Sequence, residues 1–291
     1  MINGSIVDLI IPTASDGSPD YETVETLIDW HIDNGSAALL IGSATGQHSE
    51  FNNEERGELL KRAIWQSDGR IVVIANLDTR DPDGFFELAR AADEFGADAG
   101  LLTLPTSMGL SQVDLFEYVR ELAEFAKLPL ILRDDFSHPN LLSPTTLPKL
   151  AEIEGIIGLI NDSSEPTPED NINISELPSG FALYAGHNTD ACQWVLAGYQ
   201  GGISLVGNIA PAFVNDIISA AQQNNRALAM SLNDRLRPLT QALMTDPSAN
   251  SVTWALTEMG SIPEGGHPPS LPQSSDYAQL RRALRTAQVI I

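Results

Sequence analysis

The sequence predicts an α/β fold, a (β/α)8 TIM barrel followed by a C-terminal helical appendage. Short apolar segments rich in β-branched residues alternate with helix-like segments eight times within residues 1–224. Eight such units fit a closed parallel barrel better than an open doubly wound sheet. No G-x-G-x-x-G motif follows the first apolar segment, which weakens the dinucleotide-binding alternative. Beyond residue 224 the pattern is wholly helical, so we expect a barrel over 1–224 and a helical domain over 225–291.

Each predicted strand is an apolar run that ends at polar or turn residues, which is typical of a strand covered on both faces. The eight predicted strands span residues 5–10, 37–41, 71–75, 99–104, 128–132, 155–163, 182–185 and 202–206. The functional interpretation depends on the sixth. Asn161 and Asp162 close it, and the carboxyl ends of barrel strands carry the chemistry of enzymes with this fold.

The predicted helices have apolar residues at helical spacing, and the first begins at the capping residue Asp20 and ends at Asn34-Gly35. The other helices of the barrel span 54–66, 84–95, 112–126, 145–151, 189–197 and 211–223. Segment 167–177 is a poor helix because of its Pro, Asn and Ser residues. The appendage has helices over 226–244, 251–259 and 276–289 with a Pro/Gly-rich link at 263–272, and we expect it to serve subunit contacts.

Composition and charge exclude several classes of function. A net charge of −23 and a pI near 4.3 argue against nucleic acid or an anionic membrane as partner. The single cysteine, Cys192, excludes a disulfide framework and a Cys-based zinc site. No run reaches the roughly 18 apolar residues of a membrane span, and residues 1–12 lack the features of a signal peptide. We therefore expect a cytoplasmic protein.

Two loops after predicted strands contain candidate binding residues. Residues 42–50 are rich in Gly and hydroxyl side chains, and their backbone N–H groups could hold a carboxylate or phosphate. Taken alone this signal is weak, and an ordinary capped turn is the preferred interpretation of the loop. Residues 133–138, Arg-Asp-Asp-Phe-Ser-His, are the densest ionisable cluster of the chain, and they indicate either a binding site or a solvated, salt-bridged loop.

Glycines, turn residues and apolar positions throughout the chain follow the pattern of a known family. They are Gly4 to Val7, Thr45-Gly46, 52–55, 68–70, Leu128-Pro129, 156–158, Gly186, 201–204, Val252 and Trp254-Ala255. With this essentially ungapped pattern the chain resembles the dihydrodipicolinate synthase and N-acetylneuraminate lyase family of class I aldolases, and dihydrodipicolinate synthase most closely. The resemblance implies a (β/α)8 barrel with a C-terminal helical domain, assembled as a homo-oligomer, either a dimer or a tetramer.

The same resemblance implies a lysine at the end of the sixth strand that forms a Schiff base with pyruvate or another α-keto acid. In this chain we assign that position to Asn161, whose amide nitrogen is not a nucleophilic amine. The chain has three lysines, Lys61, Lys127 and Lys149. We expect them on two helices and in the turn before the fifth strand, so none can replace the missing nucleophile.

Other family positions have also changed. The proton-relay tyrosine after the fifth strand corresponds to Arg133, and the tyrosine contributed by a neighbouring subunit corresponds to Ser107. The hydroxyl that links the two tyrosines is missing at Ala44, and the substrate-binding arginine corresponds to His138. An arginine stays protonated near neutral pH and cannot act as a general acid or base. Family residues remain at Thr45, Gly186 and Ile203.

We draw three alternative functions from this pattern. The leading hypothesis is a noncatalytic family member that keeps a pocket for a small carboxylate or α-keto acid and needs no cofactor or metal ion. Its candidate ligand-binding residues are Ala44, Thr45, Ser107, Arg133, His138, Asn161, Gly186, His187 and Ile203.

The second hypothesis is a lyase or aldolase that works without a Schiff base. His138 or His187 could titrate near neutral pH and transfer protons. Alternatively, acidic residues and His187 could bind a divalent metal ion. The acidic candidates for such a metal are Asp134, Asp135 and Asp162. The third hypothesis is a regulatory subunit of an active dihydrodipicolinate synthase.

Overall fold

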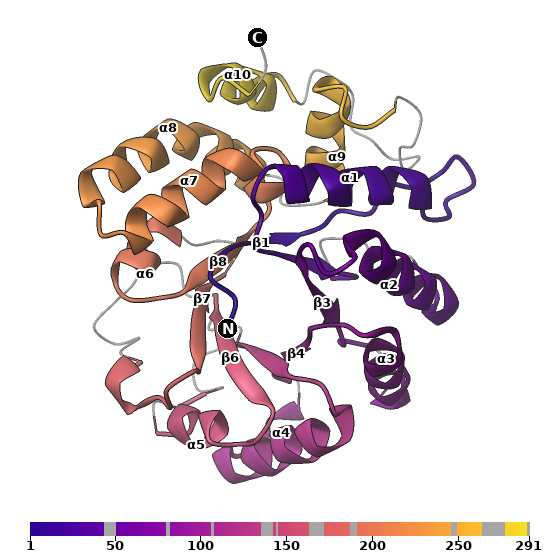
Figure 1. Cartoon of the computed structure of the whole chain (residues 1–291), viewed down its shortest axis with the longest axis vertical. Helices are drawn as coiled ribbons and strands as arrows, with labels where there is room; N and C mark the ends of the chain where they lie inside the picture. The colour runs from indigo at the N-terminus through magenta and orange to yellow at the C-terminus, as the bar shows by residue number, and fades with distance from the viewer. Residues whose placement is uncertain are drawn as a thin grey trace.

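Eight parallel strands close into a barrel in chain order, with helices around them (Figure 1). The computed structural model describes residues 1–43, 51–79, 82–105, 108–134, 142–143, 145–162, 172–186, 191–245, 249–263 and 277–289. The strands are β1 (Gly4–Asp8), β2 (Ala38–Ile41), β3 (Val72–Asn76), β4 (Ala99–Thr103), β5 (Leu130–Asp134), β6 (Ile156–Asn161), β7 (Ala182–Ala185) and β8 (Gly201–Ser204). The predicted TIM barrel is confirmed.

The helices follow the strands as the alternating pattern predicts. Those around the barrel are α1 (Tyr21–Asp33), α2 (Asn53–Ser67), α3 (Pro82–Phe95), α4 (Gln112–Ala126), α5 (Leu147–Ala151), α6 (Ala191–Leu196) and α7 (Pro211–Gln222). The C-terminal helices are α8 (Arg226–Thr245), α9 (Ala249–Glu258) and α10 (Ala278–Thr286). They lie together at one end of the molecule beside α7 and α1 (Figure 1). None of the helices in the described ranges is long and apolar enough to cross a bilayer.

Local signals explain where the helices begin and end. The Asp20 carboxylate accepts a hydrogen bond from the Thr23 backbone N–H at 3.1 Å and so caps α1. Asn52 and Glu55 form a reciprocal capping box at the start of α2. The helix between β6 and β7 is where the prediction was weakest, and residues 172–177 contain only the 3-10 turn η4 (Ile174–Glu176). The described part of that segment therefore packs as a loop.

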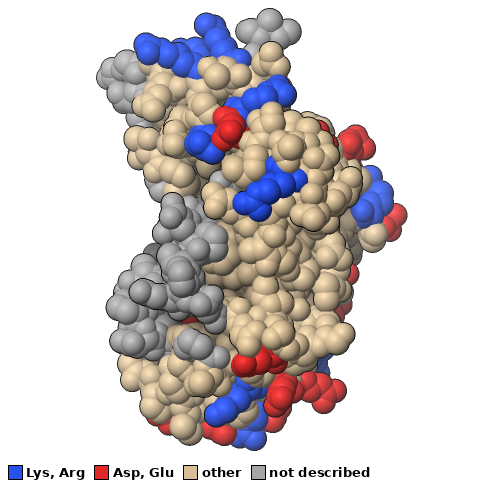
Figure 2. All heavy atoms as spheres, turned by 90° about the vertical axis from the view of Figure 1, so that its left-hand side faces the viewer, with Lys and Arg blue, Asp and Glu red and all other residues tan. Residues whose placement is uncertain are grey.

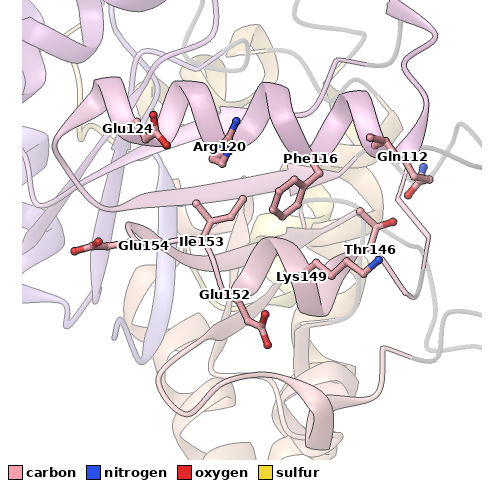
Figure 3. Close-up of a pocket in the computed structure, with 10 residues that line it drawn as sticks. Gln112, Phe116, Arg120, Glu124, Thr146, Lys149, Glu152, Ile153 and Glu154 are labelled. Carbon is pink, nitrogen blue, oxygen red and sulfur yellow. The ribbon is translucent and has the colours of Figure 1, made fainter.

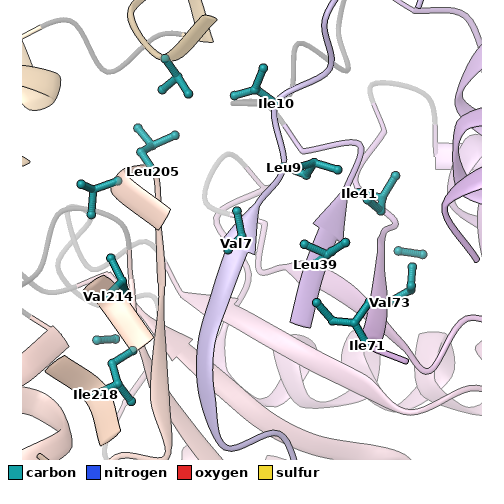
Figure 4. Packing of buried hydrophobic residues seen from close by; sticks show 14 of the residues in the cluster. Val7, Leu9, Ile10, Leu39, Ile41, Ile71, Val73, Leu205, Val214 and Ile218 are labelled. Carbon is teal, nitrogen blue, oxygen red and sulfur yellow. The ribbon is translucent and has the colours of Figure 1, made fainter. Parts of the chain in front are cut away.

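Side chains alternate between the inside and the outside of the barrel along each strand. The inner side chains form one buried apolar cluster that fills the bore: Ile2, Ile6, Ala38, Leu40, Ile74, Ala99, Leu101, Ile131, Ile160, Ala182, Tyr184 and Ile203. The outer side chains join a larger cluster with the helices. Figure 4 shows Val7, Leu39 and Val73 of the strands in this outer layer, together with Val214 and Ile218 of α7.

Closure of the barrel depends on a close approach of two glycines. Gly4 of β1 pairs with Gly201 of β8. A β-carbon at Gly201 would lie 2.0 Å from the carbonyl oxygen of Gly4, a distance at which atoms clash. Any side chain at this position would force β1 and β8 apart.

Charge is divided unevenly along the chain. Residues 1–224 contain 34 of the 39 acidic residues, whereas residues 225–291 contain 6 of the 13 arginines. Figure 2 shows Lys and Arg gathered at the end of the molecule where the C-terminal helices lie, and Arg281, Arg282 and Arg285 belong to α10 there. The acidic character therefore belongs to the barrel.

Candidate functional site

The polar centre of the barrel lies at the carboxyl ends of its strands. Two residues after the last apolar side chain that faces the bore, several strands have a polar residue that also faces inward. These residues are Asp8, Asn76, Thr103, Arg133 and Asp162. Asp8 and Asn76 are buried, and Thr103, Arg133 and Asp162 are partly exposed. We call this group, together with Asp78, whose carboxylate accepts hydrogen bonds from Thr103, the mouth of the barrel.

An ion pair between neighbouring strands dominates the mouth. Arg133 of β5 donates from Nε to Oδ2 of Asp162, just beyond β6, over 2.6 Å. The side chains are 23% and 12% exposed, so the pair is mostly shielded from water. Burial lowers the pKa of the Arg133 guanidinium. The carboxylates of Asp162, Asp8 and Asp78 outweigh that effect and raise the pKa above its usual value. Arg133 therefore remains a cation.

Hydrogen bonds hold the other carboxylates of the mouth. The Ser43 hydroxyl donates to Asp8 Oδ1. Asp78 accepts from the Thr103 backbone N–H at 2.9 Å and from the Thr103 hydroxyl at 2.6 Å. Among the residues that the structure describes, the mouth therefore presents three aspartates around one arginine, which is a poor electrostatic match for an anionic ligand.

The expectation that the Asn161 side chain lines the pocket is wrong. Asn161 follows Ile160, which faces the bore, so its side chain points to the outer layer of the barrel. There Asn161 Nδ2 donates to the Tyr199 hydroxyl over 3.0 Å, and the Tyr199 ring packs on Trp194 with ring centroids 4.7 Å apart. Asn161 is fully buried and joins β6 to the α6 region.

The remaining candidate residues fall into two groups. Arg133 faces the mouth, Gly186 directly follows β7, and Ile203 is buried in the bore. Ala44, Thr45, Ser107, His138 and His187 lie outside the described residues. Their roles remain predictions.

Sequence reasoning missed four residues of the mouth: Asp8, Asn76, Asp78 and Thr103. Asp8 and Thr103 are the polar residues that close β1 and β4, and Asp78 follows β3 by two positions. A polar residue at the carboxyl end of each apolar run is the signal that could have identified them.

A family model, that of the dihydrodipicolinate synthetase family, matches residues 1–287. The chain belongs to this family. It is 34% identical over 292 residues to the 4-hydroxy-tetrahydrodipicolinate synthase of Thiobacillus denitrificans, covering 99% of this chain and 97% of that protein. The protein of the same name from Nitrosococcus oceani is also 34% identical over 292 residues, with 100% of each chain covered.

Solved structures agree with this family membership. A chloride-inhibited dihydrodipicolinate synthase from Acinetobacter baumannii, complexed with pyruvate, matches with a TM-score of 0.91 and 32% identity over 100% of both chains. The synthase from Aquifex aeolicus matches with a TM-score of 0.88 and 27% identity, covering 99% of this chain and 98% of that one. The family's barrel and its C-terminal helices are thus both present in this chain.

A groove of about 600 Å³ lies on the outside of the family barrel, between α4 and α5 (Figure 3). It forms where α5, with 5 residues, covers only part of the 15-residue α4. Phe116 and Ile153 point toward each other across it, with charged side chains around them. The groove shares no residue with the mouth.

The acidic residues at the strand ends do not form a metal site in the described part of the chain. In the part of the chain that the structure describes, no three His, Cys, Asp or Glu side chains are grouped to hold a metal ion. Asp134 pairs in register with the outward-facing Asn161, whereas Asp162 faces the mouth. Asp134 and Asp162 therefore lie on opposite faces of the sheet and cannot share one ion.

Proposed function

We propose that this protein is a noncatalytic member of the dihydrodipicolinate synthetase family, which does not form a Schiff base with an α-keto acid. The observation that carries the proposal is the position of its lysines. Schiff-base chemistry needs an amine that reaches the substrate carbonyl.

All three lysines lie on the outside of the barrel. The Lys61 ammonium, on α2, lies over the exposed Trp65 ring, 4.5 Å from its centroid. Lys127 ends α4 in a left-handed conformation and precedes β5, at the amino end of the strands. Lys149, on α5, lines the outer groove. None of these side chains enters the bore or its mouth.

The end of β6 supports the same conclusion in either register. Asn161, the residue that the resemblance aligns with the family lysine, faces the outer layer. Its inward-facing neighbours are Ile160 and Asp162, and neither has an amine. The proposal therefore does not depend on which position is the true counterpart of the lysine.

Arg133 supports the loss of the proton relay. Its side chain faces the mouth from β5, at the position that the resemblance assigns to a relay tyrosine. A guanidinium with a raised pKa keeps its proton through the neutral range and cannot exchange it with a substrate. The geometry supports an electrostatic role for Arg133 in place of an acid–base role.

The decisive experiment is reductive trapping. The purified protein is incubated with pyruvate and borohydride and its intact mass is measured, with a 4-hydroxy-tetrahydrodipicolinate synthase treated in parallel. We expect the control protein to gain the mass of a reduced pyruvate adduct and this chain to keep its mass. A stoichiometric adduct that peptide mapping places on a lysine would refute the proposal.

A further inference from the structure

Arg133 already binds a carboxylate, and that carboxylate belongs to the chain itself. The 2.6 Å contact joins Arg133 Nε to Asp162 Oδ2. Charge-assisted hydrogen bonds of this kind are about twice as strong as neutral ones. A small carboxylate ligand that bound to the same Nε of Arg133 would have to displace Asp162 from it.

The backbone at the end of β7 provides space for Asp162. A β-carbon at Gly186 would lie 1.7 Å from Asp162 Oδ1 and 2.8 Å from the Asp162 Cα. The Gly186 N–H donates to the Asn161 carbonyl over 2.7 Å, which fixes the two strand ends relative to each other. Asp162 can therefore occupy this position only because residue 186 is glycine.

Competition from a free ligand is unfavourable for two reasons. A tethered group acts at an effective concentration in the millimolar range or above, and Asp162 is held in place by its strand. A free anion would also approach Asp8 and Asp78, whose negative charges act on Arg133. Both effects disfavour the binding of a small carboxylate to Arg133.

We infer that the Asp162 carboxylate takes the place of a ligand's carboxylate on Arg133, and that removing it opens a binding site for small monocarboxylates such as formate, acetate and pyruvate. This inference refines the proposed function, because it adds a second barrier to α-keto acids beside the missing amine. It assigns to Asp162 the role of an internal competitor.

The test is rescue of a variant by a free carboxylate. Asp162→Ala is expected to melt several degrees below the wild type because Arg133 loses this partner. Acetate, added at constant ionic strength, should restore most of the lost melting temperature along a saturable curve. We expect half-saturation in the wild type, if any is detected, to need at least about tenfold more acetate.

Three variants serve as controls. Arg133→Met/Asp162→Ala lacks the guanidinium and should not respond to acetate. Asp162→Asn keeps the size of the side chain and should block acetate while still losing stability. Asp29→Ala breaks an exposed ion pair, in which the side chains of Arg70 and Asp29 are 46% and 44% exposed. Acetate should not raise the melting temperature of this variant.

Equal responses of wild type and Asp162→Ala, or a response of the double variant, would overturn the inference. If Asp162→Ala does not fold, Asp162→Ser takes its place with the same expectations. NMR of the wild type provides an independent measurement. If Asp162 keeps acetate away from Arg133, the chemical shift of the Arg133 Nε–H should not change when acetate is added. Reductive trapping tests the proposed function separately from this inference. A lysine adduct would refute the proposed function, whereas failure of acetate to rescue Asp162→Ala would refute only this inference.

Discussion

The two ends of the barrel bore differ in chemistry. At the amino end of the strands Ile2, Ile6, Ala182 and Tyr184 pack together, and the Tyr184 hydroxyl donates to the Ile2 carbonyl over 3.1 Å. At the carboxyl end the bore closes with charged residues, chiefly Arg133 and Asp162. The packing of the apolar end depends on the shapes of its side chains, whereas the arrangement of the charged end depends on which side chains pair with each other. The fold can therefore be retained while the chemistry of the mouth changes.

The sharpest test of this comparison places a lysine at either of two adjacent positions. Ile160→Lys directs an amine into the bore, whereas Asn161→Lys directs it into the outer layer beside Tyr199. With each lysine placed in an Asp162→Ala background, which removes the competing carboxylate, we expect pyruvate and borohydride to label the Ile160→Lys protein and to leave the Asn161→Lys protein unlabelled, because only the first amine can reach the mouth. Intact mass measures both, and labelling of Asn161→Lys alone would reverse the assigned facing of β6.

The ion pair of the mouth should contribute more to stability than a surface pair. Arg133→Met leaves the carboxylate of Asp162 shielded from water without this cation, so we expect a loss of about 2 kcal/mol in the free energy of unfolding. Arg133→Met/Asp162→Leu should regain most of that loss, because the remaining charge is also removed. Arg70→Met breaks an exposed pair and should cost about 0.5 kcal/mol or less. Urea unfolding measures all three, and equal losses in the two single variants would contradict the prediction.

Sensitivity to acid should be found at the opposite end of the barrel. His31, near the end of α1, is fully buried beside the Ser36 hydroxyl, 3.2 Å from Nδ1, and burial lowers its pKa to about 3. The unfolded chain takes up a proton near pH 6.5, so stability is complete above that pH and is lost as the pH falls toward 3.

Between pH 6.5 and 5 this histidine should remove about 2 kcal/mol from the free energy of unfolding. His31→Gln keeps a polar side chain but cannot titrate, so its stability should fall less than that of the wild type over the same range. Urea unfolding at pH 7.5 and 5.0 gives the comparison. Parallel losses in both proteins would show that His31 is not the group responsible.

The smallest expected effect concerns the contact that anchors Asn161. Tyr199→Phe removes the hydroxyl that accepts from Asn161 Nδ2 and should cost about 1 kcal/mol of stability. It should leave acetate binding in Asp162→Ala unchanged, because Tyr199 lies behind the strand. A change in the acetate response would link the outer layer to the mouth.

The fold was predictable because each strand and each helix has a pattern of apolar residues that extends over several consecutive positions. Ala182–Ala185 and Gln112–Ala126 have the predicted bounds, whereas β5 begins and ends two residues later than expected, and its later end includes Arg133. The facing of the β6 side chains was not predictable. A strand buried on both faces has no alternation of polar and apolar residues, so nothing in Ile-Ile-Gly-Leu-Ile-Asn indicates which side chains point inward.

The mouth was only partly predictable for a related reason. The loop that contains Arg133 was identified from its charges, but its partner Asp162 is 29 residues away and meets it only across paired strands. Asp8 and Asp78 come from still other strands. Which polar strand ends meet depends on the register of the barrel, and that register is set by the packing of the whole sheet.

The contact between Gly4 and Gly201 has a consequence for how the chain folds. The last seam of the cylinder joins segments from near the start of the chain and from two thirds of the way along it, a pairing of high contact order that forms slowly. Until it forms, β1 and β8 are unpaired edges able to recruit strands from other molecules. A bulky residue at 201 should therefore show itself first as aggregation during refolding.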